Sequence, residues 1–161
     1  MGSTWIPNSL WADIVSHVPI VSVDLVVHTP DGVVLGKRAN EPAKGEWFVP
    51  GGRIHKNERL IDAANRIAAE ELGVETVQTL EMLGAYEHIY DTGGVDGGSK
   101  HYLANGFVVE TDTTVGEMSL DEQHTNVRGF ESGAFPADLH EYAAAYLRDA
   151  ESVAYPVDGD N

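Results

Sequence analysis

The chain contains no cysteine, and it has few basic residues. The lack of cysteine rules out disulfide bonds and thiolate metal sites. Lysine and arginine together number 10 against 26 acidic residues, so the formal net charge is −16. Because general nucleic-acid binding needs a positively charged face, this balance argues against a nucleic-acid partner.

Long apolar segments are missing as well. No apolar run reaches the length of a membrane span, and the N-terminus lacks the basic start and long apolar core of a signal peptide. We therefore expect no membrane partner and a cytoplasmic location. A length of 161 residues is enough for one domain with a substantial core and short for two. The expected organisation is a single domain over 1–161, with a helical arm at 1–17 and a frayed tail at 151–161.

Hydrophobic periodicity indicates a strand-rich chain with helices near both ends. Helices are expected at residues 8–17, 59–72 and 138–150, and strands at 19–27, 33–38, 47–49, 80–90, 101–110 and 126–130. The Thr29 to Gly32 turn suits a hairpin between the first two strands, and the glycine-rich stretch 91–100 is expected to be a mobile loop. This order is compatible with an α/β fold in which a mixed sheet lies between helical layers. The pattern alone leaves the topology open.

The two outer helices each show an apolar face in this reading. Leu10, Ile14 and Val15 are expected to face inward from the helix at 8–17. On the helix at 138–150, the shared face carries Leu139, Tyr142, Ala143 and Leu147. Both faces predict packing against the rest of the domain.

The middle helix carries a carboxylate within its own apolar stripe. At about 100° per residue, Glu71 falls near the centre of the arc, and Glu70 lies at its edge, one turn from Arg66. The arc itself is made by Leu60, Ala64, Ile67 and Ala68. A carboxylate on a core-facing stripe costs several kcal/mol unless a cation or hydrogen-bond donors meet it. Two partners stay open: a basic side chain in a buried ion pair, or Mg²⁺ or Mn²⁺ held by the oxygens of both glutamates.

Residues 51–74 (GGRIHKNERLIDAANRIAAEELGV) resemble the Nudix box. The box is a glycine, five residues, a glutamate, seven residues, and then Arg-Glu, an apolar residue, any residue, Glu-Glu, any residue, glycine and an apolar residue. The matching positions are Gly52, Glu58, Arg66, Glu70, Glu71, Gly73 and Val74. Ile67 departs from the box, because the family has there a glutamate that is a metal ligand or base in many members. The resemblance implies a single Nudix hydrolase domain with the α/β/α sandwich fold.

Four further stretches are similar to the GDP-mannose mannosyl hydrolase branch of that family. They are VSVDLVV at 21–27, LGKRAN, WFVPGGR and DEQH, and the similarity spans about residues 17–130. It implies a Mg²⁺-dependent hydrolase that converts a nucleotide sugar, GDP-mannose, to GDP and mannose. Water then attacks the anomeric carbon of the sugar instead of phosphorus. The branch is commonly dimeric, so a homodimer is also expected.

The same resemblance implies roles for individual residues. His124 is the expected general base, which must be neutral to accept a proton from water. The Gly51 carbonyl and Gln123 are expected as metal ligands beside Glu71 and Glu70. Arg38 and Arg53 are expected to contact the diphosphate and assist the departing GDP, and arginine suits this task because it grips phosphate oxygens in pairs.

Three more residues are implied as substrate contacts. The resemblance assigns His88 and Tyr102 to the leaving diphosphate and Asp24 to the sugar hydroxyls. From spacing alone, His88 and Tyr90 share one face of their strand, where ordinary sheet packing is the competing reading. Asp24 lies between Val23 and Leu25 and, without the resemblance, reads as an outward strand residue.

Two alternative functions remain open. A Nudix pyrophosphohydrolase would cut between the phosphates and give a nucleoside monophosphate and a sugar 1-phosphate, although Ile67 argues against it. A nucleotide-sugar sensor would keep the fold without chemistry, although the retained Glu70, Glu71 and Arg53 argue against that. In each case an anionic substrate would be repelled unless the few basic residues and a metal gather at the site. The acidic surplus also fits a surface adapted to high salt, where screening removes long-range repulsion.

Overall fold

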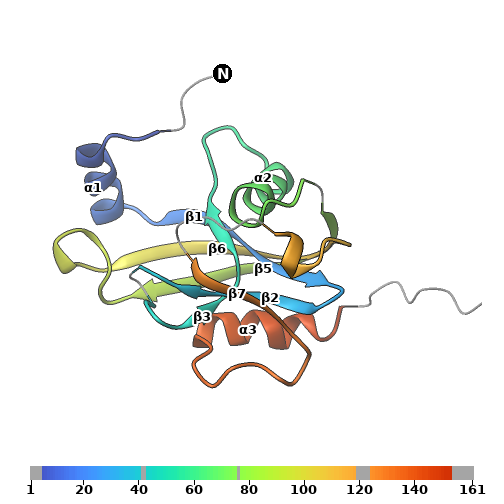
Figure 1. Cartoon of the computed structure of the whole chain (residues 1–161). Helices are drawn as coiled ribbons and strands as arrows, with labels where there is room; N and C mark the ends of the chain where they lie inside the picture. Colours follow the sequence, from blue (N-terminus) through green and yellow to red (C-terminus); the bar gives the residue numbers. More distant parts are fainter. Residues whose placement is uncertain (1–4, 41–42, 76, 119–123, 154–161) are drawn as a thin grey trace, which may run out of the picture.

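The computed structural model describes residues 5–40, 43–75, 77–118 and 124–153, and Figure 1 shows a mixed sheet between helices. Its elements in chain order are α1 (Asn8–His17), β1 (Ile20–Thr29), β2 (Gly32–Arg38), β3 (Trp47–Phe48), β4 (Gly51–Arg53), α2 (Leu60–Leu72), β5 (Gln78–Tyr90), η1 (Val95–Gly97), β6 (Lys100–Glu110), η2 (Val115–Glu117), β7 (His124–Phe130) and α3 (Glu141–Ala150). The expected α/β architecture is confirmed.

The sheet has seven strands, with β3, β2, β1, β6 and β5 in spatial order. Strands β1 and β6 run parallel, in a register that extends from Ile20 opposite Tyr102 to His28 opposite Glu110. All other strand pairs are antiparallel. The short strand β4 pairs with β1, and β7 pairs with β2. The sheet therefore has a parallel centre, as expected where helices cover both faces.

Alternation along β1 divides the core into two layers. Val23, Leu25 and Val27 pack with the inner face of α2 on one side of the sheet. Val26 points to the other side and packs with α3. Figure 1 shows α2 above the sheet and α3 below it. Because successive side chains on a strand point to opposite faces, even-numbered β1 residues near Val26 belong to the α3 side.

The ends of α2 and α3 have local causes. Gly73 ends α2 in the left-handed conformation at φ 67°, where its N–H donates to the Ala69 carbonyl at 3.0 Å. This is a common helix stop that glycine adopts without strain. Helix α3 begins at Glu141 instead of the expected residue 138. The reason is that the His140 side chain accepts a bond from the Tyr142 N–H at 3.0 Å, while Asp138 and His140 bond to the backbone of Trp47.

Some expectations were incomplete or wrong. Leu10 does not face inward from α1, because the residue is 51% exposed, whereas Val15 is buried. Strand β4 was not expected, since Gly-Gly-Arg has no strand periodicity and owes its pairing to β1. The stretch 91–100 contains the short helix η1. Across the residues that the structure describes, no helix combines the length and apolarity that crossing a lipid bilayer requires.

Candidate functional site

A cavity of about 350 Å³ opens where β1, β4 and the end of α2 meet. Its walls include two carboxylates, three basic side chains and four aromatic rings. These are Asp24 and Glu71, then Arg38, Arg53 and Lys100, then Trp11, Phe48, Tyr90 and Tyr102. The cavity thus gathers basic groups from a chain whose overall charge is strongly negative. Such a mixture suits a ligand with both anionic and ring-shaped parts.

Glu71 lies at the cavity wall although it belongs to the buried face of α2. Only 6% of the residue is exposed, and its neighbours on the stripe, Ile67 and Leu72, are almost fully buried. Its Oε2 accepts a hydrogen bond from the Gly51 N–H at 3.1 Å. The placement of Glu71 derived from helix periodicity is therefore what the structure shows, and the contact brings β4 against the end of α2.

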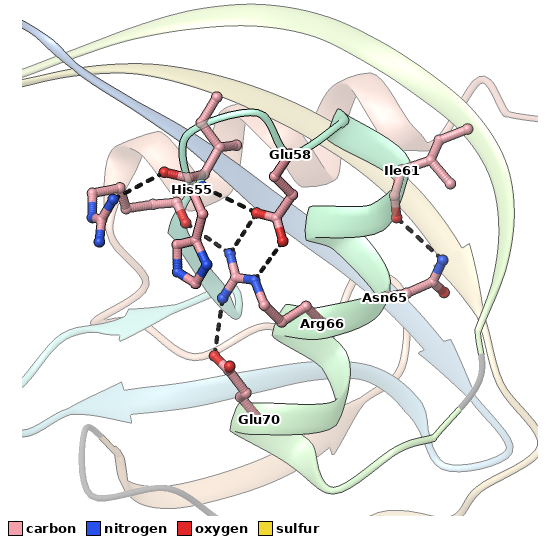
Figure 2. Close-up of polar contacts among 8 residues, drawn as sticks. His55, Glu58, Ile61, Asn65, Arg66 and Glu70 are labelled. Atoms are coloured by element: carbon pink, nitrogen blue, oxygen red, sulfur yellow. Dashed lines mark hydrogen bonds and ion pairs between the residues drawn. The ribbon is translucent and has the colours of Figure 1, made fainter. Parts of the chain in front are cut away.

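An arginine clamp holds the loop before α2, and Figure 2 shows its contacts. The Arg66 guanidinium donates to both Glu58 oxygens, from Nε at 2.7 Å and from Nη2 at 3.0 Å. It also reaches the Arg53 carbonyl at 2.8 Å and the Glu70 carboxylate at 2.9 Å. The hydrogen bond from Arg66 holds the pKa of Glu58 below its usual value. These bonds fix β4, the loop and the helix as one unit.

Glu70 is turned away from the stripe. Its side chain is 61% exposed and pairs with Arg66 one turn earlier. It would have to leave that pair to share a metal with Glu71. The two adjacent glutamates therefore have different surroundings, which is what the edge position of Glu70 on the helical arc predicted.

The oxygen atoms around Glu71 suit a hard divalent cation. A carboxylate can accept several bonds, and carboxylate and carbonyl oxygens are the ligands that Mg²⁺ and Mn²⁺ prefer. Glu71 supplies a carboxylate at the cavity wall, and Gly51 lines the same wall. Within the described part of the chain, no three acidic or histidine side chains gather as a ligand set. A bound ion would therefore need further oxygens from the backbone, from water or from residues beyond that part.

Asp24 is buried, not outward as the strand pattern alone suggested. The residue is 8% exposed, and its Oδ2 accepts a 2.7 Å hydrogen bond from the Tyr146 hydroxyl on α3. Burial raises the pKa of Asp24 to about 6, although the Tyr146 bond and the nearby Arg38 charge oppose the rise. Asp24 also faces Gly51 across the β1 and β4 pairing. Alternation along β1 did not predict this burial, because helix α3 covers the face of the sheet to which Asp24 points.

His88 lies behind Asp24 and not on the cavity wall. It is 3% exposed, its ring stacks on Tyr142 at 4.2 Å, and its Nδ1 is 3.8 Å from the Asp24 Oδ2. Burial lowers the pKa of His88 to about 4, so near pH 7 the contact with Asp24 joins a neutral ring to a carboxylate. Its Nε2 is buried without a hydrogen-bond partner among the described atoms. This placement does not match the direct diphosphate contact that the resemblance implies.

The two arginines expected at the diphosphate do meet at the cavity. Arg38 ends β2, and Arg53 ends β4. The guanidinium of Arg53 lies over the Trp11 ring at 5.6 Å from its centroid, a distance at which a cation and an aromatic face attract each other. Trp11 comes from α1, so the N-terminal helix contributes to the wall.

Tyr90 and Tyr102 form the aromatic side of the cavity. Their rings meet edge to face at 6.3 Å, and Lys100 Nζ lies 5.4 Å from the Tyr102 centroid. Tyr102 is the register partner of His88 on the adjacent strand. The sequence argument that grouped these residues on one face therefore agrees with the sheet, although only the tyrosines reach the cavity.

Two expected residues fall at or beyond the limit of the description. Gln123 lies outside the described residues, as does the side chain of His124. The backbone of His124 begins β7 and pairs with Arg38. Because Arg38 lines the cavity, the start of β7 lies beside the site.

Sequence reasoning missed two residues, Tyr146 and Trp11. Tyr146 was not among the residues expected on the apolar face of α3, and nothing near it in the sequence marks its bond to Asp24, 122 residues away. Trp11 lies on α1, whose expected inward face was made of the aliphatic residues Leu10, Ile14 and Val15. The contact between Trp11 and Arg53 depends on how α1 packs against the sheet, so the sequence gives no local signal for it.

Comparisons with known proteins give a family match over most of the chain. The profile of the NUDIX domain matches residues 18–154 of this chain. The low-salt glycan biosynthesis protein Agl8 of Haloferax volcanii is 51% identical over 148 residues, which cover 90% of each protein. An ADP-ribose pyrophosphatase of Methanocaldococcus jannaschii is 34% identical over 68 residues, or 42% of this chain and 40% of that protein.

Solved structures show the same fold. A MutT NUDIX hydrolase of Burkholderia pseudomallei superposes with a TM-score of 0.66 at 24% identity, over 81% of this chain and 97% of that one. The NUDIX domain of Shewanella oneidensis NrtR, solved with ADP ribose, gives a TM-score of 0.62 at 17% identity, over 91% and 97%. At these identities the likeness concerns the fold alone.

Proposed function

This chain belongs to the Nudix hydrolase family, and from that premise we propose that it hydrolyses a nucleotide sugar, GDP-mannose, to GDP and mannose. The observation that carries the proposal is the contrast between Glu71 and Ile67, two positions on the same face of α2. Glu71 reaches the cavity, whereas Ile67 is 1% exposed and belongs to the core. The family's second carboxylate is therefore replaced by a packed apolar side chain, which favours chemistry that does not rely on it.

The cavity offers charge for a diphosphate and polar groups for a sugar. Arg38 and Arg53 supply fixed positive charge, and Tyr102 supplies a hydroxyl donor for the same oxygens. Asp24 supplies an acceptor for sugar hydroxyls from the opposite side of Gly51. The Haloferax volcanii relative is a glycan biosynthesis protein, which supports a sugar-containing substrate here.

A divalent metal belongs to this proposal. Glu71 and the Gly51 carbonyl would hold Mg²⁺ or Mn²⁺, completed by Glu70 or Gln123, and the ion would offset charge on the diphosphate. Glu70 would first have to release Arg66, to which it is bonded at 2.9 Å. Gln123 would supply an amide oxygen in place of the carboxylate that Ile67 lacks.

His124 is the proposed general base. Its neutral imidazole takes a proton from water as that water attacks the anomeric carbon. The bond between that carbon and the diphosphate oxygen breaks, GDP leaves with the bonding electron pair, and the sugar is released with inverted configuration. The basic side chains stabilise the charge that develops on the departing phosphate oxygen. Support for this role is the pairing of the His124 backbone with Arg38 at the cavity edge.

Product analysis in ¹⁸O water tests the proposal. The protein is incubated with GDP-mannose and Mg²⁺, and the products are examined by mass spectrometry. We expect unlabelled GDP and mannose that carries ¹⁸O. Label in a phosphate, with GMP and mannose 1-phosphate as products, would show the pyrophosphohydrolase reaction instead. That alternative has one observation in its favour, the partial match to an ADP-ribose pyrophosphatase, so ADP-ribose is assayed in parallel.

The His124→Gln variant tests the base separately. We expect turnover to fall about 100-fold or more, with little change in KM, because the side chain acts on water and not on substrate binding. An unchanged turnover would remove His124 as the base. Tight binding of GDP-mannose without any product would instead favour a sensor.

A further inference from the structure

The carboxylate of Asp24 is held from behind by a residue that does not line the cavity. Tyr146 is fully buried on α3, and its hydroxyl donates to Asp24 Oδ2 at 2.7 Å. Asp24 itself lines the cavity, and Tyr146 does not. One oxygen of the carboxylate is therefore occupied by the protein interior. The other, Oδ1, lies on the side of Gly51.

The surroundings of Asp24 leave its side chain little room to rotate. An added Cβ on Gly51 would lie within 1.8 Å of Oδ1, so only glycine allows the carboxylate to approach β4 so closely. On the Oδ2 side, His88 Nδ1 lies 3.8 Å from the same oxygen that accepts the tyrosine hydroxyl. The orientation of Asp24 thus depends on contacts from β4, β5 and α3 together.

The ring of Tyr146 is also fixed in place. An added Cβ on Gly106 in β6 would come within 2.6 Å of the ring, so this glycine makes the space that the ring fills. The ring packs on Tyr86 at 4.4 Å and on His88 at 5.5 Å. Burial and the nearby carboxylate raise the pKa of Tyr146 well above its ordinary value, which keeps the hydroxyl protonated as a donor.

Neighbouring tyrosines direct their hydroxyls elsewhere. Tyr142 donates to the Ile89 carbonyl at 2.9 Å, a bond to the backbone of β5. Tyr86 donates to Asp149 at 2.6 Å, on the outer side of α3. Each of these bonds ties α3 to strand β5. The bond from Tyr146 instead ends on a side chain of the cavity wall.

We propose that Tyr146 is a positioning residue for the substrate's sugar, acting through Asp24. Its hydroxyl holds one carboxylate oxygen so that the other is presented to the sugar hydroxyls with a fixed direction. The identity of the ligand rests on the proposed function, whereas the hydrogen bond and the fixed orientation do not. Loss of a hydrogen bond to a charged group changes affinity or rate by about 10-fold to 100-fold.

Tyr146→Phe removes the hydroxyl and keeps the ring that fills the space at Gly106. Tyr86→Phe is the matched control, because it removes a hydroxyl from the same aromatic cluster without touching Asp24. We expect Tyr146→Phe to lower kcat/KM for GDP-mannose about 10-fold or more, while the affinity for GDP, which has no sugar to contact Asp24, changes less than about 2-fold. Tyr86→Phe should leave both values unchanged. Equal losses for GDP and GDP-mannose would overturn the inference.

A double-mutant cycle shows whether the effect passes through Asp24. In an Asp24→Ala background, adding Tyr146→Phe should change kcat/KM less than about 2-fold. A further loss as large as that in the wild-type background would mean that the tyrosine acts by another route, and the inference would fail.

A readout that needs neither turnover nor a tyrosine variant separates this inference from the proposed function. In proton NMR of the isotope-labelled wild-type protein, the Tyr146 hydroxyl should give a slowly exchanging, assigned signal that is lost or strongly shifted in Asp24→Ala. If that holds while GDP-mannose is not hydrolysed, the proposed function fails alone. No such signal, or one unchanged in Asp24→Ala, overturns the inference whatever the enzyme hydrolyses.

Discussion

Arg66 and Glu58 form a two-pronged ion pair across the loop that leads into α2. The two N–O distances are 2.7 and 3.0 Å, and the side chains are only 21% and 14% exposed. Pairs of this geometry are stronger and more specific in direction than single ion pairs. Since the same guanidinium bonds to the Arg53 carbonyl, it links the site's β4 strand to the helix that carries Glu71.

Replacing Arg66 by alanine should lower the free energy of unfolding by about 1–3 kcal/mol, because the half-buried Glu58 carboxylate would lose its charged partner. Chemical denaturation at pH 7 measures the change. Asp138→Ala is the control, since it removes an exposed 3.7 Å pair with Lys37 and should cost less than about 1 kcal/mol. The deficit of Arg66→Ala should narrow in acid as Glu58 becomes protonated. A deficit no larger than that of the control would contradict the role of the clamp.

Glu71→Gln should abolish the response of the protein to Mg²⁺. The amide keeps the shape of the side chain, but removing a charged ligand should weaken metal affinity roughly 100-fold or more. The melting temperature is compared with and without Mg²⁺, since a ligand that binds only the folded state raises it. Glu75→Gln, an exposed position just beyond the helix, serves as the control. The same rise in Glu71→Gln as in the wild type would exclude Glu71 as a ligand.

Asp24→Asn should make the protein more stable at neutral pH. The pKa of the Asp24 carboxyl in the folded state is about 6, against an ordinary value of 3.8. This carboxyl therefore contributes stability below about pH 3.8 that is lost as pH rises through 6, by up to about 3 kcal/mol. Asparagine avoids that loss and can still accept the Tyr146 bond. We expect unfolding free energies in metal-free buffer that are similar near pH 4 and separate by pH 7.

The pKa of His88 changes in the opposite sense. Burial depresses it to about 4, so its contribution to stability is present above pH 6.5 and is lost as pH falls through 4. Near pH 7 the buried His88 ring is neutral in the folded protein, so the comparison with Asp24→Asn is made there, where titration of the ring contributes little. Equal stability of Asp24→Asn and wild type at pH 7 would show that the Asp24 carboxylate is not destabilising.

Gly51 and Gly52 should respond differently to alanine. A Cβ on Gly51 meets Asp24 at 1.8 Å and the Val23 carbonyl at 2.9 Å, whereas on Gly52 it meets Ile67 at an ordinary 3.4 Å. Gly51→Ala should therefore cost about 1–3 kcal/mol and displace Asp24 from Tyr146, with loss of activity. Gly52→Ala should cost less than about 1 kcal/mol. Denaturation and kcat/KM measure both variants, and equal behaviour of the two would refute the steric reading.

Helix periodicity predicted the surroundings of Glu71 and Glu70 correctly. The rotation per residue is set by local hydrogen bonds within the helix, so the stripe and its edge follow from 13 consecutive residues. The matching positions of the box, from Gly52 to Val74, likewise lie within one local stretch. These features were open to prediction because no distant contact is needed to place them.

The partners of Asp24 were decided only by the tertiary structure. Tyr146 is 122 residues away, and strand β4 exists because β1 supplies its pairing. Alternation along β1 separates the two faces of the sheet, but it does not say which face a helix will cover. Local pattern therefore determined the helix that carries Glu71 and the family fold, whereas the buried carboxylate and its tyrosine required long-range packing, because each is stabilised by a surface that the other end of the chain provides.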